Sequence, residues 1–579
     1  MRKILILAVV ALFVGLTACQ KAQDELYQLD FARAFIPANF DHDPVQRPSI
    51  TRPTVMELST TLSWRTSPNI HAYELQITTD TTFGTIDREI TLHRDSLRFV
   101  MDELPFLTWY GARVRALAPL GSEQENSHWN TLVFQTPAEQ LFLPFRRGDV
   151  RSESVFVRWH EGAAVTHIEV IDLRTGDLFR RVDLTAQNIN DAELLIEGLG
   201  MVEGEAPAII RGAPYRVDIF SGDALRGQLN FETNSRANRD HPGVRFLEVG
   251  DDLRPVLENL GTERVIVLPD GFEQVFTTGN IAISGTVHIF GDQDGDRPAI
   301  TLDAGIGHRF FILPETADSI VFEGIDIIGA EEPVAGANAF FYVINQATNE
   351  ASNVRMLRFE NTVVRNFGEG FIRLQGTATG THTHIENLVL ENSIMTDFSH
   401  ERLGGRFGFI NIGNTGSFGL IDNIVITNTT IARVEHSFMN IVGTTGGSEQ
   451  VVRTILFDNV TFDRVVSDLN TRYLIDGQTH SNIAITIRNT IFGSTNGPEA
   501  RGIRVHNDSP IVVSNSFRTR DWVTTNPEAP STEDFHIPSL MNYSGGRENM
   551  FADPDYDDFF LRDVGFAGRS TTGDPRWRP

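Results

Sequence analysis

The sequence predicts an all-β protein in which two β-sandwiches precede a long parallel β-helix. Two observations support this prediction. Between about residues 45 and 235, short apolar runs are separated by turn residues at a spacing suited to sandwich strands. After residue 240, an eleven-residue pattern recurs at intervals of 30 to 37 residues. These intervals are too irregular for propeller blades, but they suit stacked coils whose loops vary in length.

The first nineteen residues have the pattern of a secretory signal, because Arg2 and Lys3 precede an apolar run that ends in small residues and Cys19. The stretch "LTAC" resembles the lipobox of bacterial lipoproteins, which implies that Cys19 is lipidated. The acidic pair Asp24 and Glu25 resembles the signal that exports Bacteroidota lipoproteins to the exterior face of the outer membrane. Cys19 is the only cysteine, so no disulfide forms within the chain.

Residues 20–44 are polar and interrupted by prolines, which predicts a tether between the lipid and the first folded domain. The formal net charge of −27 argues against nucleic acid as a partner. The chain contains only two lysines, Lys3 and Lys21. Any chemistry after residue 21 that needs a cation must therefore use arginine, histidine or a metal ion.

Residues 45–137 have the strand pattern of a seven-stranded sandwich. Trp64 and Tyr73 fall on successive predicted strands, and Leu104, Thr108 and Tyr110 precede the strand "RVRA". These residues resemble the core tryptophan and the tyrosine corner of fibronectin type III domains. The resemblance implies that the tryptophan lies in the core and does not serve as a sugar platform.

Residues 138–235 contain a weaker copy of the same pattern. Trp159 lies in "SVFVRWHEG" and Tyr215 lies in "GAPYRVDIF". We expect a second fibronectin type III-like sandwich with both side chains in its core.

Residues 240–579 form the predicted β-helix. Asp251 or Asp252 can cap a short helix whose Leu253, Val256 and Leu257 share one face, and a strand is expected at 265–268. This arrangement resembles the amino-terminal cap of pectin-lyase-like, right-handed, single-stranded parallel β-helices. A helix at that position covers the open edge of the stacked sheets.

The repeated pattern places an asparagine inside what is otherwise a strand. Stacked coils put equivalent residues above one another, about 4.8 Å apart. We therefore expect an asparagine ladder at a bend, with amides that bond from coil to coil and a structural role. Its members are Asn361, Asn392, Asn428, Asn459 and Asn489, and Gly324 takes the same place in an earlier coil.

Ionisable residues also stack in this register. Five residues after the ladder, the column contains Asn366, Asp397, Arg433 and Arg464; eight residues after it, Glu369, His400, His436 and Ser467. Nearby are Glu401, Arg402, Arg406, Glu435, Asp468 and Arg472. These residues are candidates for a glycan-binding or catalytic site, and the alternative is that they are solvated turn residues paired with one another.

If this site is catalytic, the resemblance to pectate lyases implies β-elimination of a uronate-containing polysaccharide. That reaction needs a base and a cation near the uronate carboxylate. Arg433, Arg464, His400 or His436 would serve as base, and Glu369 or Asp397 could hold Ca²⁺. The Asn-Thr-Asp and Gly-His-Gly signatures of polygalacturonases are missing, which argues against hydrolysis.

The stretch "GDQDGDRP" places Asp292, Asp294 and Asp296 at alternating positions, as in a calcium loop. It lacks the later bidentate glutamate of such a loop, so a plain turn is the competing interpretation. Ca²⁺ is the only cofactor that the sequence suggests.

The predicted architecture resembles the surface lipoproteins of Bacteroidota polysaccharide-utilisation systems, and the ending "FADPDYDDFFLRDVGFAGRSTTGDPRW" resembles their closing segment. The resemblance implies a glycan-binding protein on the exterior of the outer membrane, with acidic polysaccharide and other surface glycan-uptake proteins as partners. Two alternatives remain open: a polysaccharide lyase, and a structural or adhesive surface protein.

Overall fold

The computed structural model describes residues 33–578 except 50–54, 147, 201–206, 278–279, 303–308, 330–340, 347–349, 375–382, 413–418, 442–451, 468, 470–471, 478–482, 498–499, 507, 525–536 and 564. Cys19 and the predicted lipobox lie outside the described residues. Within the described part of the chain, no helix is both long and apolar enough to cross a membrane.

Two compact units divide the chain. The first contains the described residues up to Phe145 together with Phe156–Leu195 and Tyr215–Phe231. The second contains Arg146–Val155, Ile196–Pro214 and everything from Glu232 onward.

The first sandwich has the seven strands that its sequence predicts. One sheet has the order β1-β2-β5 and the other β4-β3-β6-β7, both antiparallel. The strands are β1 (Asp41–Pro48), β2 (Met56–Ser63), β3 (Ala72–Thr78), β4 (Arg88–His93), β5 (Arg98–Met101), β6 (Trp109–Leu117) and β7 (Asn130–Gln135). Trp64 and Tyr73 are buried between the sheets, which confirms their predicted core position.

The first sandwich begins earlier than predicted. Strand β1 starts at Asp41, and Ala34 packs into the core, so part of the predicted 20–44 tether belongs to the folded domain. The sequence did not predict this strand, because "DHDPVQRP" contains two prolines and few apolar residues. Prolines are tolerated there because β1 is an edge strand of its sheet.

The second sandwich also has two sheets, β11-β8 and β10-β9-β13-β14. Trp159 and Tyr215 are buried, as predicted. The strands are β8 (Ser154–Arg158), β9 (His167–Asp172), β10 (Leu178–Asp183), β11 (Glu193–Glu197), β13 (Pro214–Ser221) and β14 (Ala224–Glu232), with helix α2 (Ala186–Asp191) before β11. The short strands β12 (Ile209–Ile210) and β15 (Arg236–Ala237) pair separately.

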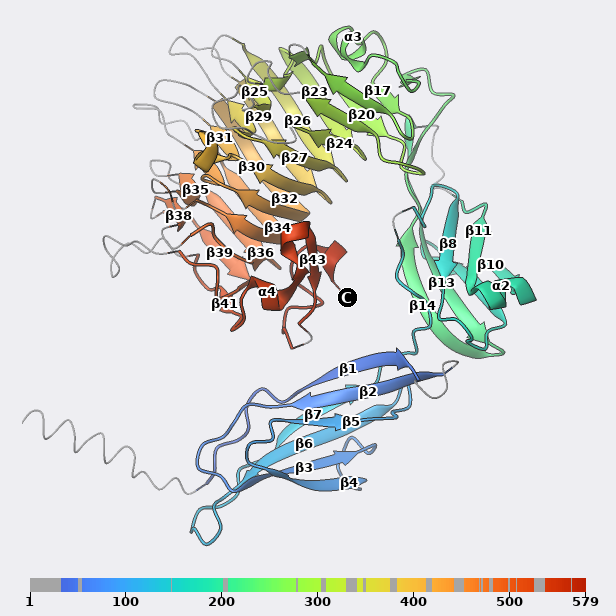
Figure 1. Ribbon diagram of the computed structural model, residues 1–579, viewed down its shortest axis with the longest axis vertical. Coiled ribbons are helices and arrows are strands. Elements are labelled where there is room, and N and C mark those ends of the chain that lie inside the picture. The colour runs from blue at the N-terminus through green and yellow to red at the C-terminus, as the bar shows by residue number, and fades with distance from the viewer. Residues whose placement is uncertain are drawn as a thin grey trace, which may run out of the picture. The chain divides into compact units, whose positions relative to one another are not determined.

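The remainder of the chain is a parallel β-helix in which each full coil contributes strands to three parallel ladders (Figure 1). The first ladder contains β16 (Val244–Phe246), β17 (Val265–Leu268), β20 (Val287–Gly291), β23 (Thr316–Glu323), β26 (Ser352–Glu360), β29 (Thr383–Glu391), β36 (Ala484–Arg488), β39 (Ile511–Ser514) and the first halves of β32 (Gly419–Val434) and β34 (Thr454–Val465).

The second ladder follows the asparagine bend and includes the second halves of β32 and β34. Its other strands are β18 (Glu273–Phe276), β21 (Ala299–Leu302), β24 (Asp326–Ile328), β27 (Val363–Phe367), β30 (Ile394–Phe398), β37 (Ile491–Phe492), β40 (Phe517–Arg518) and β41 (Met541–Asn542). The third ladder contains β19 (Ile281–Ala282), β22 (Arg309–Ile312), β25 (Tyr342–Gln346), β28 (Gly370–Leu374), β31 (Ile410–Ile412), β33 (Met439–Ile441), β35 (Tyr473–Gly477) and β38 (Arg501–Val505).

Aromatic side chains repeat along the interior with the same period as the coils. The rings of Phe371 and Phe409 stack at 5.0 Å, and Phe409 stacks on Phe438 at 5.0 Å. These rings belong to one apolar core that runs from Leu247 to Ile537. Burial of this continuous core is the main force that stacks the coils.

Both ends of the β-helix carry additional elements. Helix α3 (Leu253–Glu258) has Asp252 as its N-cap and buries Leu253, Val256 and Leu257, which confirms the predicted cap. At the other end, helix α4 (Arg547–Met550) precedes β42 (Phe551–Asp553) and β43 (Asp558–Leu561). One 3-10 turn, Pro554–Tyr556, lies between these two strands, and another, Pro575–Trp577, comes after β43. We call residues 546–578 the C-terminal segment.

The C-terminal segment packs on outward-facing residues of the β-helix. Phe551, Phe559 and Leu561 form a separate apolar cluster with Ala432 and Ile491. The segment therefore has its own hydrophobic contact with the coils.

Candidate functional site

The predicted asparagine ladder is present as a column of left-handed bends. Asn361, Asn392, Asn428, Asn459 and Asn489 have φ angles of 50°, 49°, 49°, 57° and 51°, and Gly324 has 71°. Asparagine and glycine are the residues that adopt this conformation at least cost. These six positions therefore share one left-handed backbone conformation, and we call them the bend column.

In the middle coils the bonding along the stack differs from the prediction, because the residues after Asn361, Asn392 and Asn428 make it. At the C-terminal end an amide does bond from coil to coil, since Asn515 donates to Asn489 Oδ1 at 2.8 Å. The hydroxyl of Ser393 accepts from the N–H of Thr362 at 3.1 Å, and that of Thr429 accepts from the N–H of Ser393 at 3.3 Å. Thr362, Ser393 and Thr429 are buried, so their hydroxyls must find partners inside the coil. The asparagines lie half-buried or exposed, where water can satisfy their amides.

The amides of the bend column have partners at its two ends. Asn361 donates to Gln293 Oε1 at 2.9 Å, Asn459 Oδ1 accepts from Arg578 at 2.6 Å, and Asn489 donates to Asp458 at 3.0 Å. In the middle, the side-chain amides of Asn392 and Asn428 make no hydrogen bond to any other described residue. Two neighbouring coils therefore present free donors and acceptors.

An acidic column runs directly beside the bend column. Arg358 donates to Glu391 Oε2 at 2.6 Å and lies 3.2 Å from Glu360 Oε2, so one guanidinium bridges two coils. Successive strands pair Glu323, Glu360, Glu391, Thr427 and Asp458 in register.

The carboxyl groups in this column differ in pKa. Burial, and then the charge of Glu323, raise the pKa of Glu360. Burial acts in the same direction on Glu323, but His288 at 2.9 Å and Arg211 at 2.9 Å together hold the pKa of Glu323 below its usual range. Glu323 is thus a structural anion held by His288 and Arg211.

A groove of about 820 Å³ runs along these two columns. The β-helix contributes Glu360, Asn361, Asn392 and Asn428 to its wall, and the C-terminal segment contributes Asp574 to Arg576. We call it the bend groove.

The C-terminal wall of the bend groove is held firmly. Arg576 donates to the carbonyl oxygens of Ser393 at 3.0 Å and Asn428 at 3.1 Å, and to Asp574 at 2.8 Å. Asp574 is buried and also accepts from Thr430 at 2.8 Å. The wall is therefore built before any ligand arrives.

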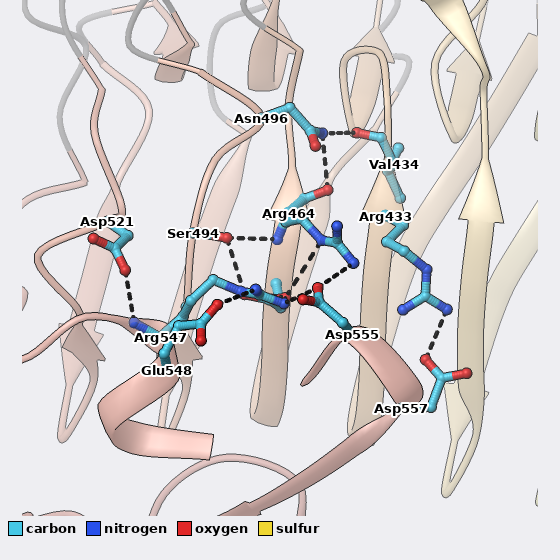
Figure 2. A network of polar contacts seen from close by, with 12 residues as sticks. Arg433, Val434, Arg464, Ser494, Asn496, Asp521, Arg547, Glu548, Asp555 and Asp557 are labelled. Carbon is cyan, nitrogen blue, oxygen red and sulfur yellow. Dashed lines mark hydrogen bonds and ion pairs between the residues drawn. The ribbon is translucent and has the colours of Figure 1, made fainter. Parts of the chain in front are cut away.

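The predicted arginine donors, Arg433 and Arg464, lie elsewhere. Together with Asn366 and Asp397 they form a second column of left-handed residues, with φ between 47° and 67°. Arg433 donates to Asp397 at 2.6 and 2.8 Å and lies 2.7 Å from Asp557 (Figure 2). Arg464 lies 2.9 Å from Asp555. Both guanidinium groups are neutralised within the protein and are not available to a glycan carboxylate.

Arg547 anchors the segment that carries these two aspartates. Its guanidinium donates to both oxygens of Asp463, at 3.0 and 2.7 Å, and Asp463 is fully buried. Arg547 also donates to Asp555 at 3.1 Å (Figure 2). Burial raises the pKa of Asp463 despite this partner.

The second predicted column, Glu369, His400, His436 and Ser467, is stacked as expected but largely inaccessible. Glu369 and His436 are each 3% exposed. Burial, and then the charge of Arg472, lower the pKa of His436 to about 4. A side chain this deeply buried cannot reach a polysaccharide, so His436 is not positioned as a lyase base.

Other members of this region also pair within the protein. Glu401 accepts from Arg472 Nε at 3.0 Å, Arg402 donates to the carbonyl of Asn496 at 3.5 Å, and Arg406 lies 3.6 Å from Glu369. His400 is half-buried, and burial lowers its pKa. Asp468 lies outside the described residues. These contacts match the alternative interpretation of paired turn residues.

The suggested calcium loop is occupied by protein contacts. Asp294 accepts from the N–H of Ser152 at 2.7 Å and from Asn234 at 3.2 Å, and Asp292 accepts from the N–H of Asp294 at 3.2 Å. Among the described residues, no three acidic, histidine or cysteine side chains form a group that could hold a metal ion. Residues 294–296 form a bend, and the carboxylate of Asp294 ties down a neighbouring loop.

Sequence reasoning missed Glu360, Glu391, Arg358 and Arg576 as groove residues. The glutamates had a visible signal, because "FENT" and "LENS" repeat an acidic residue before the asparagine. Arg576 had none, since 183 residues separate it from the Ser393 carbonyl that it contacts.

Comparison with known proteins gives matches in solved structures only. No family model and no curated protein matches the chain. It is similar to a two-domain fibronectin type III segment of chicken tenascin, at 15% identity and a TM-score of 0.18, over 34% of this chain and 99% of that one. It is also similar to the FN1–FN3 domains of chicken CNTN1, at 16% identity and a TM-score of 0.15, over 35% and 68% of the two chains. The central fibronectin-III array of RIM-binding protein matches at 14% identity and a TM-score of 0.13, over 35% and 69%.

Proposed function

We propose that this protein binds a polysaccharide along the bend groove, centred on Asn392 and Asn428. The observation that carries the proposal is that these two amides, on neighbouring coils, line a groove and have no partner among the other described residues. Each amide offers two donors and an acceptor, the complement that vicinal sugar hydroxyls require.

The spacing of the coils supports a polymer as the ligand. Equivalent groups on successive coils lie about 4.8 Å apart, and a sugar residue in an extended chain advances by a similar distance. A linear glycan laid along the stack would therefore meet one asparagine per residue.

The charges of the groove favour a neutral glycan over the acidic one expected from the sequence. Each arginine in its wall already faces a carboxylate: Arg211 with Glu323, Arg358 with Glu360, and Arg576 with Asp574. A uronate would have to displace one of these pairs, whereas carboxylates and amides accept hydrogen bonds from neutral hydroxyls directly.

The test is affinity electrophoresis in gels that contain neutral or acidic polysaccharides. Asn392→Gly combined with Asn428→Gly removes both amides and keeps a residue that tolerates positive φ, as Gly324 does in the same column. The expected result is a loss of affinity for a neutral glycan on the order of 100-fold, since about four hydrogen bonds disappear.

Asn459→Gly combined with Asn489→Gly is the matched control, because these bends lie outside the groove wall. It should retain binding. Full retention by the Asn392/Asn428 variant, or equal loss in both, would contradict the proposal. If the wild type binds no glycan in the panel, a structural or adhesive role becomes the better explanation.

The proposal includes the location inferred from the sequence: a lipidated Cys19 that holds the protein on the exterior of the outer membrane, within a glycan-uptake system. The lipobox pattern supports it.

A further inference from the structure

The last coil of the β-helix carries two adjoining grooves that are separate from the bend groove. They have volumes of about 640 and 350 Å³, and Arg520, Tyr543 and Ser544 line both. Arg518 completes one and Arg562 the other. Strand β41 and helix α4 lie close together at this end of the stack (Figure 1).

Two arginines in these grooves keep unused hydrogen-bonding capacity. Arg518 donates through Nε to Asn542 Oδ1 at 2.7 Å, and it has no carboxylate within ion-pair distance among the described residues. The Arg520 side chain is 73% exposed, and its ion-pair contact in the described chain is with Asp521 at 3.8 Å. Asp521 also accepts a hydrogen bond from the backbone N–H of Arg547 at 2.8 Å. The Asp521 carboxylate is therefore shared between Arg520 and this N–H.

The acidic residue that lines the grooves is also satisfied locally. Asp563 accepts from the hydroxyl of Tyr543 and from the N–H of Gly565 at 2.9 Å. Burial and this hydrogen bond raise the pKa of Tyr543, so the phenol stays protonated and keeps its contact with Asp563. Asp563 is therefore already supplied with donors and competes weakly for the arginines.

Arg562 has a different role in the wall. Its guanidinium donates to the carbonyl oxygens of Asn549 at 3.5 Å and Ala552 at 3.4 Å, and to that of Glu548. The Glu548 and Asn549 carbonyls belong to helix α4 and that of Ala552 belongs to β42, so Arg562 fixes the backbone that frames the groove.

We propose that Arg518 and Arg520 form an oxyanion site that takes a carboxylate or sulfate group carried by an acidic polymer. A guanidinium presents paired N–H donors in the plane that such groups prefer, and it keeps its charge at neutral pH. The chain's net charge of −27 opposes a polyanion at long range, but screening limits that repulsion to about 10 Å at ordinary salt. This site is independent of the bend groove and of the glycan proposed there.

The test compares dextran sulfate with uncharged dextran in affinity gels, with inorganic sulfate as a competitor. Arg518→Ala combined with Arg520→Ala should weaken retention on dextran sulfate at least about tenfold and leave the melting temperature unchanged. Arg453→Ala combined with Arg488→Ala is the control: it removes the same charge from side chains 64% and 51% exposed that lie outside the grooves. The control should lose less than about twofold, since screened surface charges contribute little.

Equal loss in both variants would show unspecific attraction and overturn the site, as would a wild type that dextran sulfate does not retain. If millimolar inorganic sulfate releases the protein from dextran sulfate, the oxyanion chemistry is supported, and a free anion is sufficient to occupy the site. Polygalacturonate in place of dextran sulfate separates carboxylate from sulfate. Retention of the Arg518/Arg520 variant on a neutral glycan should be unchanged, so failure here and failure of the bend groove are distinguishable.

Discussion

At the scale of single residues, the repeat predicts the backbone conformation of the bend column but not all of its hydrogen bonds. Five asparagines in equivalent places predict left-handed bends, because few other residues adopt positive φ cheaply, and the structure confirms them. The pattern does not tell which atoms bond across coils. The hydroxyls of Ser393 and Thr429 take that role in the middle coils, and the amide of Asn515 takes it at Asn489. A buried N–H selects the nearest buried acceptor, and burial is decided by the whole coil.

This distinction predicts how Asn428 contributes to stability. Asn428→Leu should destabilise the protein by about 1–2 kcal/mol relative to Asn428→Gly, because a positive φ is sterically strained for leucine and not for glycine. Chemical denaturation of the two variants measures the difference. Equal stabilities would mean that the bend relaxes and that its conformation is not what selects asparagine.

His436 gives a pH prediction at the same scale. Folded His436 has a pKa of about 4, against 6.5 for an ordinary histidine, because it is buried beside Arg472. As pH falls from about 6.5 to 4, the unfolded chain takes up a proton that the folded chain refuses. Stability should therefore fall by roughly 3 kcal/mol across this window.

The measurement is the denaturation midpoint against pH for His436→Gln, which should lose this part of the slope. His506→Gln removes a histidine that is 50% exposed and serves as the control. A slope in His436→Gln equal to that of the wild type would refute the assignment.

At the scale of elements, the sequence predicts an element correctly where the residues that stabilise it lie close together in the chain. Helix α3 was predictable down to its cap, because Asp252 and the buried Leu253, Val256 and Leu257 lie within six residues. The ion pairs of Arg433 and Arg464 with the C-terminal segment were not predictable, because their aspartate partners lie about a hundred residues later in sequence. No local pattern in "FADPDYDD" says which coil its carboxylates will meet.

The attachment of the C-terminal segment depends on the buried pair between Arg547 and Asp463. Arg547→Met should cost about 3–5 kcal/mol, because it leaves a fully buried carboxylate without its cation. Adding Asp463→Leu should recover much of that loss, since the pair is then replaced by apolar side chains. Equilibrium denaturation of the single and double variants tests this.

Arg453→Met is the comparison. The Arg453 side chain is 64% exposed and Asp422 also contacts His384, so this ion pair should contribute less than about 1 kcal/mol. A loss as small in Arg547→Met as in Arg453→Met would contradict the anchoring role.

At the scale of the whole molecule, each folded part has its own core. The first sandwich buries Trp64 and Tyr73 in a cluster that ends at Phe134, and the β-helix core begins at Leu247. Ligand chemistry proposed for the bend groove lies wholly in the second unit. Binding should therefore survive changes at the far end of the chain, including the loss of a membrane anchor.

Cys19→Ala tests that separation together with the proposed lipid anchor. The variant should move from the membrane fraction to the soluble fraction or remain unprocessed, because the only thiol that could carry lipid is gone. Fractionation followed by mass measurement of the mature protein distinguishes these outcomes, and protease accessibility on intact cells reports whether the wild type faces the exterior. The purified variant should be retained on a glycan gel as strongly as the wild type, since the groove residues Asn392 and Asn428 lie more than 300 residues from Cys19 in sequence. Unchanged membrane association and processing would refute lipidation at Cys19, whereas lost glycan retention would show that the anchor and the groove are coupled.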